Sequence, residues 1–228
     1  MPDTQQFRCL GHPTLYAPDG TAVRFRVKKH LALLAFLAME PRTHRRDRLA
    51  ELLWPAVSER EGRHSLATGL SVLRARLGQR SIDAGRDTVR LVPGAVELDL
   101  DRLAAGDVLG SDIMPVLAVA PLLEDFDVPD APGWNQWKDA QSANWQPRIR
   151  DALLTLVDRS RRHGDTRTME RLADSLLAID SLSEEGIRAK REARAFAGDR
   201  LSALKQFEAW KTRLADEVGA VPGDLVEG

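Results

Sequence analysis

The chain has 228 residues, of which 43% are hydrophobic and 29% charged, values that are ordinary for a folded protein and argue against a disordered one. Residues 1–98 contain 16 Lys and Arg against 10 Asp and Glu, whereas residues 99–228 contain 17 against 24. The basic first part indicates contact with a polyanion, and chance variation of surface residues is the alternative explanation.

Several classes of protein are excluded by what the sequence lacks. Cys9 is the only cysteine, so neither an intramolecular disulfide nor a zinc site built on cysteines is possible. The five histidines have no paired spacing on one helix, and we expect no metal. Without a phosphate-binding glycine loop or a nucleophile motif, we expect no cofactor and no enzyme. No leader and no apolar run of about 20 residues is present, which predicts a cytoplasmic protein that makes no membrane contact.

The N-terminal elements begin with short strands and continue with helices. Phe7–Leu15 and Val23–Val27 are predicted to pair as a hairpin, because Ala17–Gly20 (APDG) is a strong turn sequence between them. Lys29–Met39 has apolar residues at helical spacing and precedes Pro41, which predicts a buried helix. Arg45–Trp54 is a second predicted helix, ended by Pro55.

A longer helix follows, over Glu59–Leu77. Ser58 and Glu61 have the spacing of a capping box, in which each side chain binds a backbone amide of the other residue. Gly62 and Gly69 lie near the apolar stripe of this helix, where we expect the close approach of a neighbouring helix. The stripe consists of Leu66, Leu70, Leu73 and Leu77.

Thr88–Val92 and Ala95–Leu98 alternate apolar and polar residues around Pro93-Gly94, and we predict a second hairpin there. Strands, three helices and a hairpin form the order of a winged helix-turn-helix. We therefore predict a DNA-binding domain over residues 1–98.

From Asp99 onward, helical periodicity dominates. Gly164-Asp165 and Gly198-Asp199 lie 34 residues apart, which is the period of a stacked helix–turn–helix repeat. We predict an all-α domain over residues 99–228, and truncation at its C-terminus stays open. Its long helices are expected near Trp134–Arg162, Thr166–Ile179, Ser183–Ala197 and Arg200–Glu217.

In a winged helix, the second motif helix enters the major groove and the wing can reach the minor groove. The expected recognition face comprises Arg63, His64, Thr68, Ser71 and Arg74. Backbone and wing contacts are expected from Arg45, Arg46, Arg86 and Arg90, and His44 and Arg48 belong to the same basic cluster. The alternative is that both are ordinary solvated surfaces. The five tryptophans are interpreted as packing residues and not as a ligand cage.

Several motifs, in this order and spacing, resemble the Streptomyces antibiotic regulatory protein (AfsR/DnrI-like) activators, which join an OmpR-type winged helix to a bacterial transcriptional activation domain. In the first part the matching segments are Arg48–Pro55 (RLAELLWP), Ser65-Leu66, Leu70–Gly78 (LSVLRARLG), Thr88–Arg90 (TVR) and Gly94. In the second part they are Leu122–Phe126 (LLEDF), Trp137, Ile179–Glu185 (IDSLSEE), Gly198–Arg200 (GDR), Ala203-Leu204 and Glu217–Pro222 (EVGAVP).

The resemblance implies a mainly α fold with small β elements, in which an OmpR-type winged helix-turn-helix precedes an all-α tetratricopeptide-like domain. It also implies a homodimeric activator that binds direct-repeat double-stranded DNA and recruits RNA polymerase, with Trp54, Pro55 and Ser58 in the polymerase-facing loop. Two alternatives stay open. One is a protein-interaction adaptor that no longer binds DNA, motivated by the weakly basic recognition face and by Ala95 in place of the usual wing tyrosine. The other is the N-terminal part of a larger ligand-sensing regulator.

Overall fold

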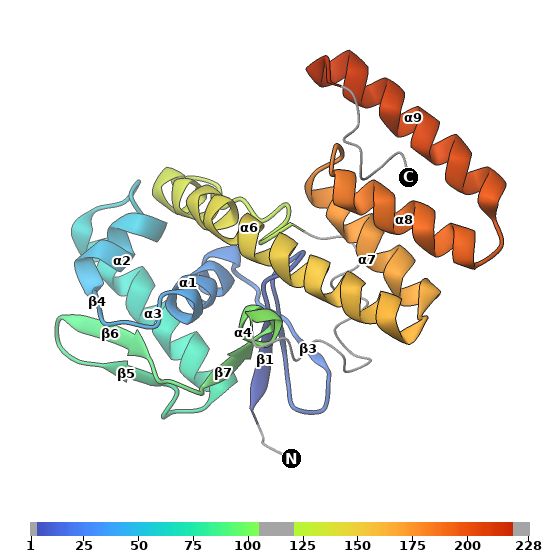
Figure 1. Cartoon of the computed structure of the whole chain (residues 1–228). Helices are drawn as coiled ribbons and strands as arrows, with labels where there is room; N and C mark the ends of the chain where they lie inside the picture. The colour runs from blue at the N-terminus through green and yellow to red at the C-terminus, as the bar shows by residue number, and fades with distance from the viewer. Residues whose placement is uncertain (1–3, 105–120, 221–228) are drawn as a thin grey trace. The chain divides into compact units, whose positions relative to one another are not determined.

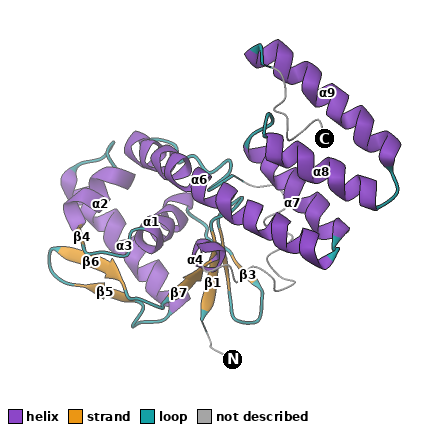
Figure 2. Ribbon diagram, viewed as in Figure 1, coloured by secondary structure: helices purple, strands orange, loops and turns teal. Residues whose placement is uncertain are grey.

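The computed structural model describes residues 4–104 and 121–220 (Figure 1). Its chain contacts divide it into two compact units. The first contains the described residues of Met1–Arg102 and Leu122–Ala143, and the second contains those of Leu103–Pro121 and Asn144–Gly228. The structure is mainly helical with small sheets, as predicted (Figure 2). The last two residues of the motif ending at Pro222 lie outside the described residues.

Two small sheets belong to the first unit. The leading sheet has the order β3-β2-β1-β7, in which β1 pairs antiparallel with β2 and parallel with β7. The second sheet has the order β4-β6-β5, with antiparallel pairing throughout. Strand bounds in the leading sheet are β1 Gln5–Arg8, β2 Thr14–Tyr16, β3 Ala22–Val23 and β7 Val96–Leu98. Those in the second sheet are β4 His44–Arg45, β5 Ile82–Ala84 and β6 Thr88–Leu91.

The predicted hairpin of Thr88–Val92 with Ala95–Leu98 is wrong, because β6 and β7 lie in different sheets. β6 pairs with β5 instead, placing Arg90 opposite Asp83. The turn at Pro93-Gly94, closed by a 3.0 Å hydrogen bond from Ala95 N to Val92 O, leads the chain away to the leading sheet. The wing is therefore the β5–β6 hairpin.

The first predicted hairpin is also wrong in part. Phe7–Leu15 is not one strand, because the chain turns at Gly11, where φ is +85°, and β1 and β2 pair with each other. The turn at Ala17–Gly20 is confirmed by a 2.8 Å hydrogen bond from Gly20 N to Ala17 O, and it joins β2 to β3. Of Val23–Val27, only Val23 is in a strand.

Three helices form the core of the first unit: α1 Lys28–Met39, α2 Arg46–Leu53 and α3 Glu59–Leu77. A short helix, α4 Asp99–Ala104, follows β7. The buried Asp99 carboxylate accepts hydrogen bonds from the amides of Cys9 at 2.8 Å and Leu10 at 2.8 Å, so it joins the end of β1 to the start of α4. Burial raises the pKa of Asp99 above its ordinary value, although these amides favour its charged form.

Residues 122–143 pack in the first unit, so the compact units do not divide at residue 98. Leu123 N donates to Cys9 O at 2.8 Å, and Phe126 and Trp134 are buried. The Trp137 ring lies 4.9 Å from that of Phe36. The long helix α6, Pro132–His163, thus contributes its first turns to one unit and the remainder to the other.

The second unit contains the rest of α6 with α7 Thr166–Ile179, α8 Glu184–Phe196 and α9 Arg200–Val218. Two similar turns join α6 to α7 and α8 to α9. Gly164 and Gly198 have φ values of +67° and +85°, and Asp165 and Asp199 cap the next helix by accepting hydrogen bonds from Thr168 N and Ser202 N. The two turns, 34 residues apart, thus share a glycine with positive φ and an aspartate cap.

Charged pairs join neighbouring helices of the second unit. Arg150 and Arg161 of α6 bind Glu185 and Glu192 of α8, at 2.5 Å and 2.8 Å. Ile187, Phe207, Trp210 and Leu214 form a buried cluster between α8 and α9. Among residues 4–104 and 121–220, no helix has both the length and the apolar character to cross a bilayer.

Candidate nucleic-acid interface

Local sequence and tight packing position α3. The predicted capping box is present: Glu61 N donates to Ser58 Oγ at 3.4 Å, and Ser58 N donates to Glu61 Oε2 at 3.0 Å. Hydrogen bonds from the Ser58 hydroxyl and amide lower the pKa of Glu61. A β-carbon at Gly69 would lie 3.2 Å from Leu33 Cδ2 and 3.3 Å from His30 Cδ2 in α1. The expected close approach of a neighbouring helix is confirmed, and it holds one face of α3 against the core.

The opposite face of α3 carries three of the predicted DNA-binding residues. His64, Thr68 and Ser71 are all exposed and follow one another at about one helical turn. The Thr68 hydroxyl donates to His64 O at 3.1 Å. The His64 ring and the Ser71 hydroxyl have no hydrogen-bond partner among the described residues, so both can bind a base edge or a phosphate.

Arg63 is exposed but already paired. Its guanidinium lies 2.8 Å from Asp47 Oδ1 in α2 and 2.8 Å from Glu59 Oε1 one turn earlier in α3. Arg45 also faces Asp47, at 3.4 Å. These carboxylates offset the positive charge that the sequence places beside the recognition face.

Arg74 and Arg46 join the helices to the wing. The half-buried Arg74 donates to Ile82 O in β5 at 3.3 Å. The Arg46 side chain donates to Gly85 O at 3.1 Å, and its amide donates to Asp87 O at 2.9 Å. Both arginines therefore orient the wing, a role that the spacing of residues along one helix cannot reveal.

The wing carries the other two predicted arginines. Arg90 forms a cross-strand ion pair with Asp83 at 3.0 Å. Arg86 lies in the loop between β5 and β6, where it is exposed and has no hydrogen bond or ion pair with the described residues. Arg86 is thus a wing cation available for a phosphate or for the minor groove.

His44 does not belong to the exposed basic cluster in which the sequence placed it. Its side chain is buried, its Nε2 lies 2.9 Å from Glu40 O, and its ring contacts that of Phe36 edge-on at 4.9 Å. The alternation of strand β4 explains this, since His44 points inward and Arg45 outward. Arg48 is exposed.

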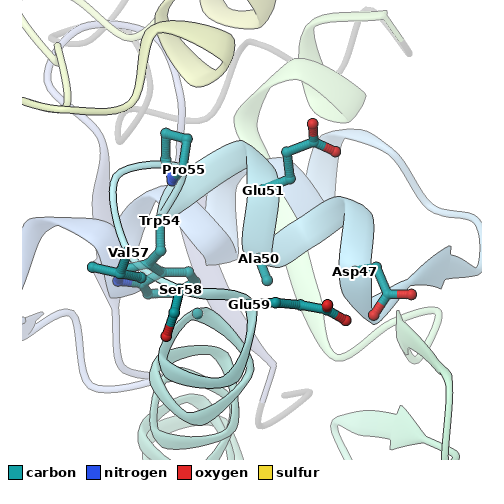
Figure 3. A pocket seen from close by; sticks show the side chains of 9 residues that line it. Asp47, Ala50, Glu51, Trp54, Pro55, Val57, Ser58 and Glu59 are labelled. Atoms are coloured by element: carbon teal, nitrogen blue, oxygen red, sulfur yellow. The ribbon is translucent and has the colours of Figure 1, made fainter.

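A pocket of about 390 Å³ lies at the turn between α2 and α3, where the resemblance placed a polymerase-facing loop (Figure 3). Trp54 is half-buried and Pro55 is exposed, while Ser58 is engaged in the capping box. Carboxylates line one side of the pocket (Asp47, Glu51 and Glu59), and Ala50, Trp54, Pro55, Val57, Ser58 and Gly62 line the rest. Asp47 and Glu59 are both paired with Arg63, so Glu51 is the carboxylate of this lining without an ion pair among the described residues.

Within the described residues, no group of three or more His, Cys, Asp or Glu side chains is arranged to hold a metal ion. The side chains brought together on this unit are arginines, hydroxyls, an imidazole and paired carboxylates. The arginines, hydroxyls and imidazole can form hydrogen bonds or ion pairs with a polyanion.

The fold is similar to that of a solved structure. Mycobacterium tuberculosis EmbR, in complex with a low-affinity phosphopeptide, matches with a TM-score of 0.64 and 21% sequence identity, over 99% of this chain and 64% of that one. This chain thus spans less than two thirds of the EmbR chain. The likeness confirms the fold class of a winged helix followed by an all-α domain. No family model and no curated protein sequence matches the chain.

Proposed function

We propose that this chain is a sequence-specific DNA-binding transcription regulator. The observation that carries the proposal is the outward face of α3, where His64 and Ser71 stand exposed without partners on a winged helix. An imidazole and a hydroxyl at this position can form hydrogen bonds with base edges in the major groove. Arg86 supplies a cation on the wing, and phosphate contacts would make the affinity fall with salt.

The finer assignment is an activator of the AfsR/DnrI-like type, cytoplasmic and without enzymatic activity. It would bind direct-repeat sites as a homodimer and recruit RNA polymerase. The motif resemblance supports this assignment, and the fold shared with EmbR is compatible with it. The pocket beside Trp54 and Pro55 would then contact the polymerase.

Genomic DNA capture with the full chain at moderate salt tests the proposal. We expect enrichment of one repeated motif with regular spacing. His64→Ala and Ser71→Ala should change the base preference at defined positions, with about 1–3 kcal/mol of discrimination lost where a base contact is removed. Glu208→Gln, on the exposed surface of α9, is the control and should leave the motif unchanged. Identical motifs and affinities for all variants would exclude α3 as the reading helix.

A specific observation favours a second function, that of a protein-interaction adaptor whose winged helix has lost DNA binding. Arg63, Arg45 and Arg90 are each paired with a carboxylate. Nonspecific duplex DNA at low salt distinguishes the two functions, because only a DNA-binding chain should change its electrophoretic mobility. Asp47→Asn should tighten the complex with DNA, because it frees Arg45 and removes one of the two carboxylates that pair with Arg63. If neither the parent chain nor the Asp47→Asn variant changes its mobility with DNA, the adaptor is favoured.

A further inference from the structure

A second pocket lies in the helical unit, away from the residues assigned to DNA. Its volume is about 210 Å³, room for roughly seven water molecules at their volume in the liquid. The lining includes apolar side chains of α7 and α8, with polar side chains of α8 and α9 beside them. The residues that matter here are Leu177, Ile187, Lys190, Gln206, Trp210 and Arg213.

Two polar atoms of this lining lack hydrogen-bond partners. Gln206 Oε1 and Trp210 Nε1 are both buried, and neither binds another described group. Trp210 as a whole is only 4% exposed. Because buried donors and acceptors are nearly always paired in folded proteins, an unpaired acceptor and an unpaired donor one turn apart indicate that a bound group completes them.

The charged side chains of the pocket are positive. Lys190 is mostly buried and pairs with Asp174 at 2.6 Å. Arg213 is 53% exposed and lies 4.0 Å from Glu217, at the limit of an ion pair. Arg213 can therefore turn toward an anion in the pocket without breaking a close contact.

We propose that this pocket binds a group containing an amide next to a carboxylate. The amide oxygen would accept from Trp210 Nε1, the amide N–H would donate to Gln206 Oε1, and the carboxylate would pair with Arg213. Leu177 and Ile187 would pack against the aliphatic part. An acylated acidic amino acid and an acidic residue within a peptide share this chemistry, and the pocket volume suits either. The site does not depend on the function proposed for the winged helix.

Water does not reach either unpaired atom in this conformation. Binding therefore requires a rim side chain to move, and Gln206 is the candidate, since it is half-buried with three rotatable side-chain bonds. Its rotation would present the amide oxygen to the pocket and open a path to the indole N–H.

The test is a titration of the full chain, observed through the ¹⁵N-labelled indole N–H signals. The probes are N-acetyl-glutamate and the blocked tripeptide acetyl-Ala-Glu-Ala-amide. Trp210→Phe assigns the Trp210 signal, and Trp145 of α6, outside the pocket, is the internal control. We expect a saturable downfield shift of the Trp210 signal, with the Trp145 signal unchanged. A shift with N-acetyl-glutamate indicates a small-molecule ligand, and a shift with the tripeptide alone indicates a protein segment.

Gln206→Leu and Arg213→Gln should each weaken binding by about tenfold, the loss expected for one hydrogen bond or ion pair. Glu208→Gln on the same helix should bind like the parent chain. Absence of a Trp210 shift with both probes at millimolar concentration would overturn the proposal. Undiminished binding by folded Gln206→Leu and Arg213→Gln would overturn it equally.

Discussion

The two glycines of α3 differ in how closely other side chains approach them. A β-carbon at Gly62 would meet its nearest neighbour, Ala50 Cβ, at an ordinary 3.5 Å. A β-carbon at Gly69 would lie only 3.2 Å from Leu33 Cδ2 and 3.3 Å from His30 Cδ2, which is closer than an ordinary contact. The position of α3 against α1 therefore depends on Gly69 more than on Gly62.

This difference predicts opposite effects of substitution. Gly62→Ala should raise the free energy of unfolding by up to about 1 kcal/mol, because alanine favours the helix. Gly69→Val should lower it by about 1–3 kcal/mol, because its methyl groups overfill the space against α1. Urea unfolding of the full chain measures both values. A Gly69→Val variant as stable as the parent would contradict the assigned packing.

At the same scale, the sequence predicted which residues of α3 are exposed but not what they bind. The positions of His64, Thr68 and Ser71 follow from helical periodicity relative to the leucine stripe. The pairing of Arg63 with Asp47, and of Arg74 with the backbone of Ile82, depends on how α2 and the wing pack against α3. No local pattern contains that information, so the sequence could not show that these two arginines already have partners.

At the scale of elements, helices were easier to predict than strand pairing. The bounds of α3 and α7 agree with the sequence because capping residues mark their first turns. The pairing of β1 with β7, by contrast, joins residues near 5 to residues near 96. Strands of two to four residues are too short for their alternation to identify a partner, which is why a hairpin was expected at Pro93-Gly94.

The repeated caps of α7 and α9 predict a pH dependence. Hydrogen bonds from the side chains and amides of Thr168 and Ser202 lower the pKa values of Asp165 and Asp199. A carboxylate whose pKa is lower in the folded than in the unfolded chain stabilises the protein at pH values above its unfolded pKa, near 3.9. This contribution is lost as pH falls through the lower pKa of the folded state. The double variant Asp165→Asn, Asp199→Asn should thus be less stable than the parent at pH 7, with a smaller difference near pH 3.

Thermal unfolding followed by circular dichroism at both pH values checks this expectation. Asp151→Asn, on the exposed surface of α6, is the matched control and should show no comparable convergence. A difference between parent and double variant that stays constant with pH would show that the charge of the two caps does not contribute.

At the scale of the whole molecule, the winged-helix unit is completed by residues far along the chain. Leu122, Phe126 and Trp134 are buried in it, and the indole of Trp137 donates to Glu40 Oε1 at 3.2 Å. Their motifs were visible in the sequence, but they were placed with the helical domain, because resemblance shows the order of segments and not the surface on which they pack.

Two fragments test this packing. In the first, a short flexible linker joins residues 1–104 to residues 121–143, and the second contains residues 1–102 alone. We expect the first fragment to have the larger free energy of unfolding. Trp134→Ala in the full chain should lower the free energy of unfolding of the first unit by about 3–5 kcal/mol, the usual loss for a buried tryptophan. Denaturant unfolding measures both effects. Equal stability of the two fragments would show that residues 122–143 are dispensable for the unit.

A unit built from two separated stretches also has a consequence for inheritance. A recombination event that exchanged a contiguous gene segment ending near residue 98 would transfer the three-helix core without Phe126, Trp134 and Trp137. A crossover that preserves the unit must fall within the codons of α6, near residue 143, where both parental sequences have to continue one helix. We therefore expect the gene segments for the winged helix and for the following helices to be inherited together, and their sequences to diverge together.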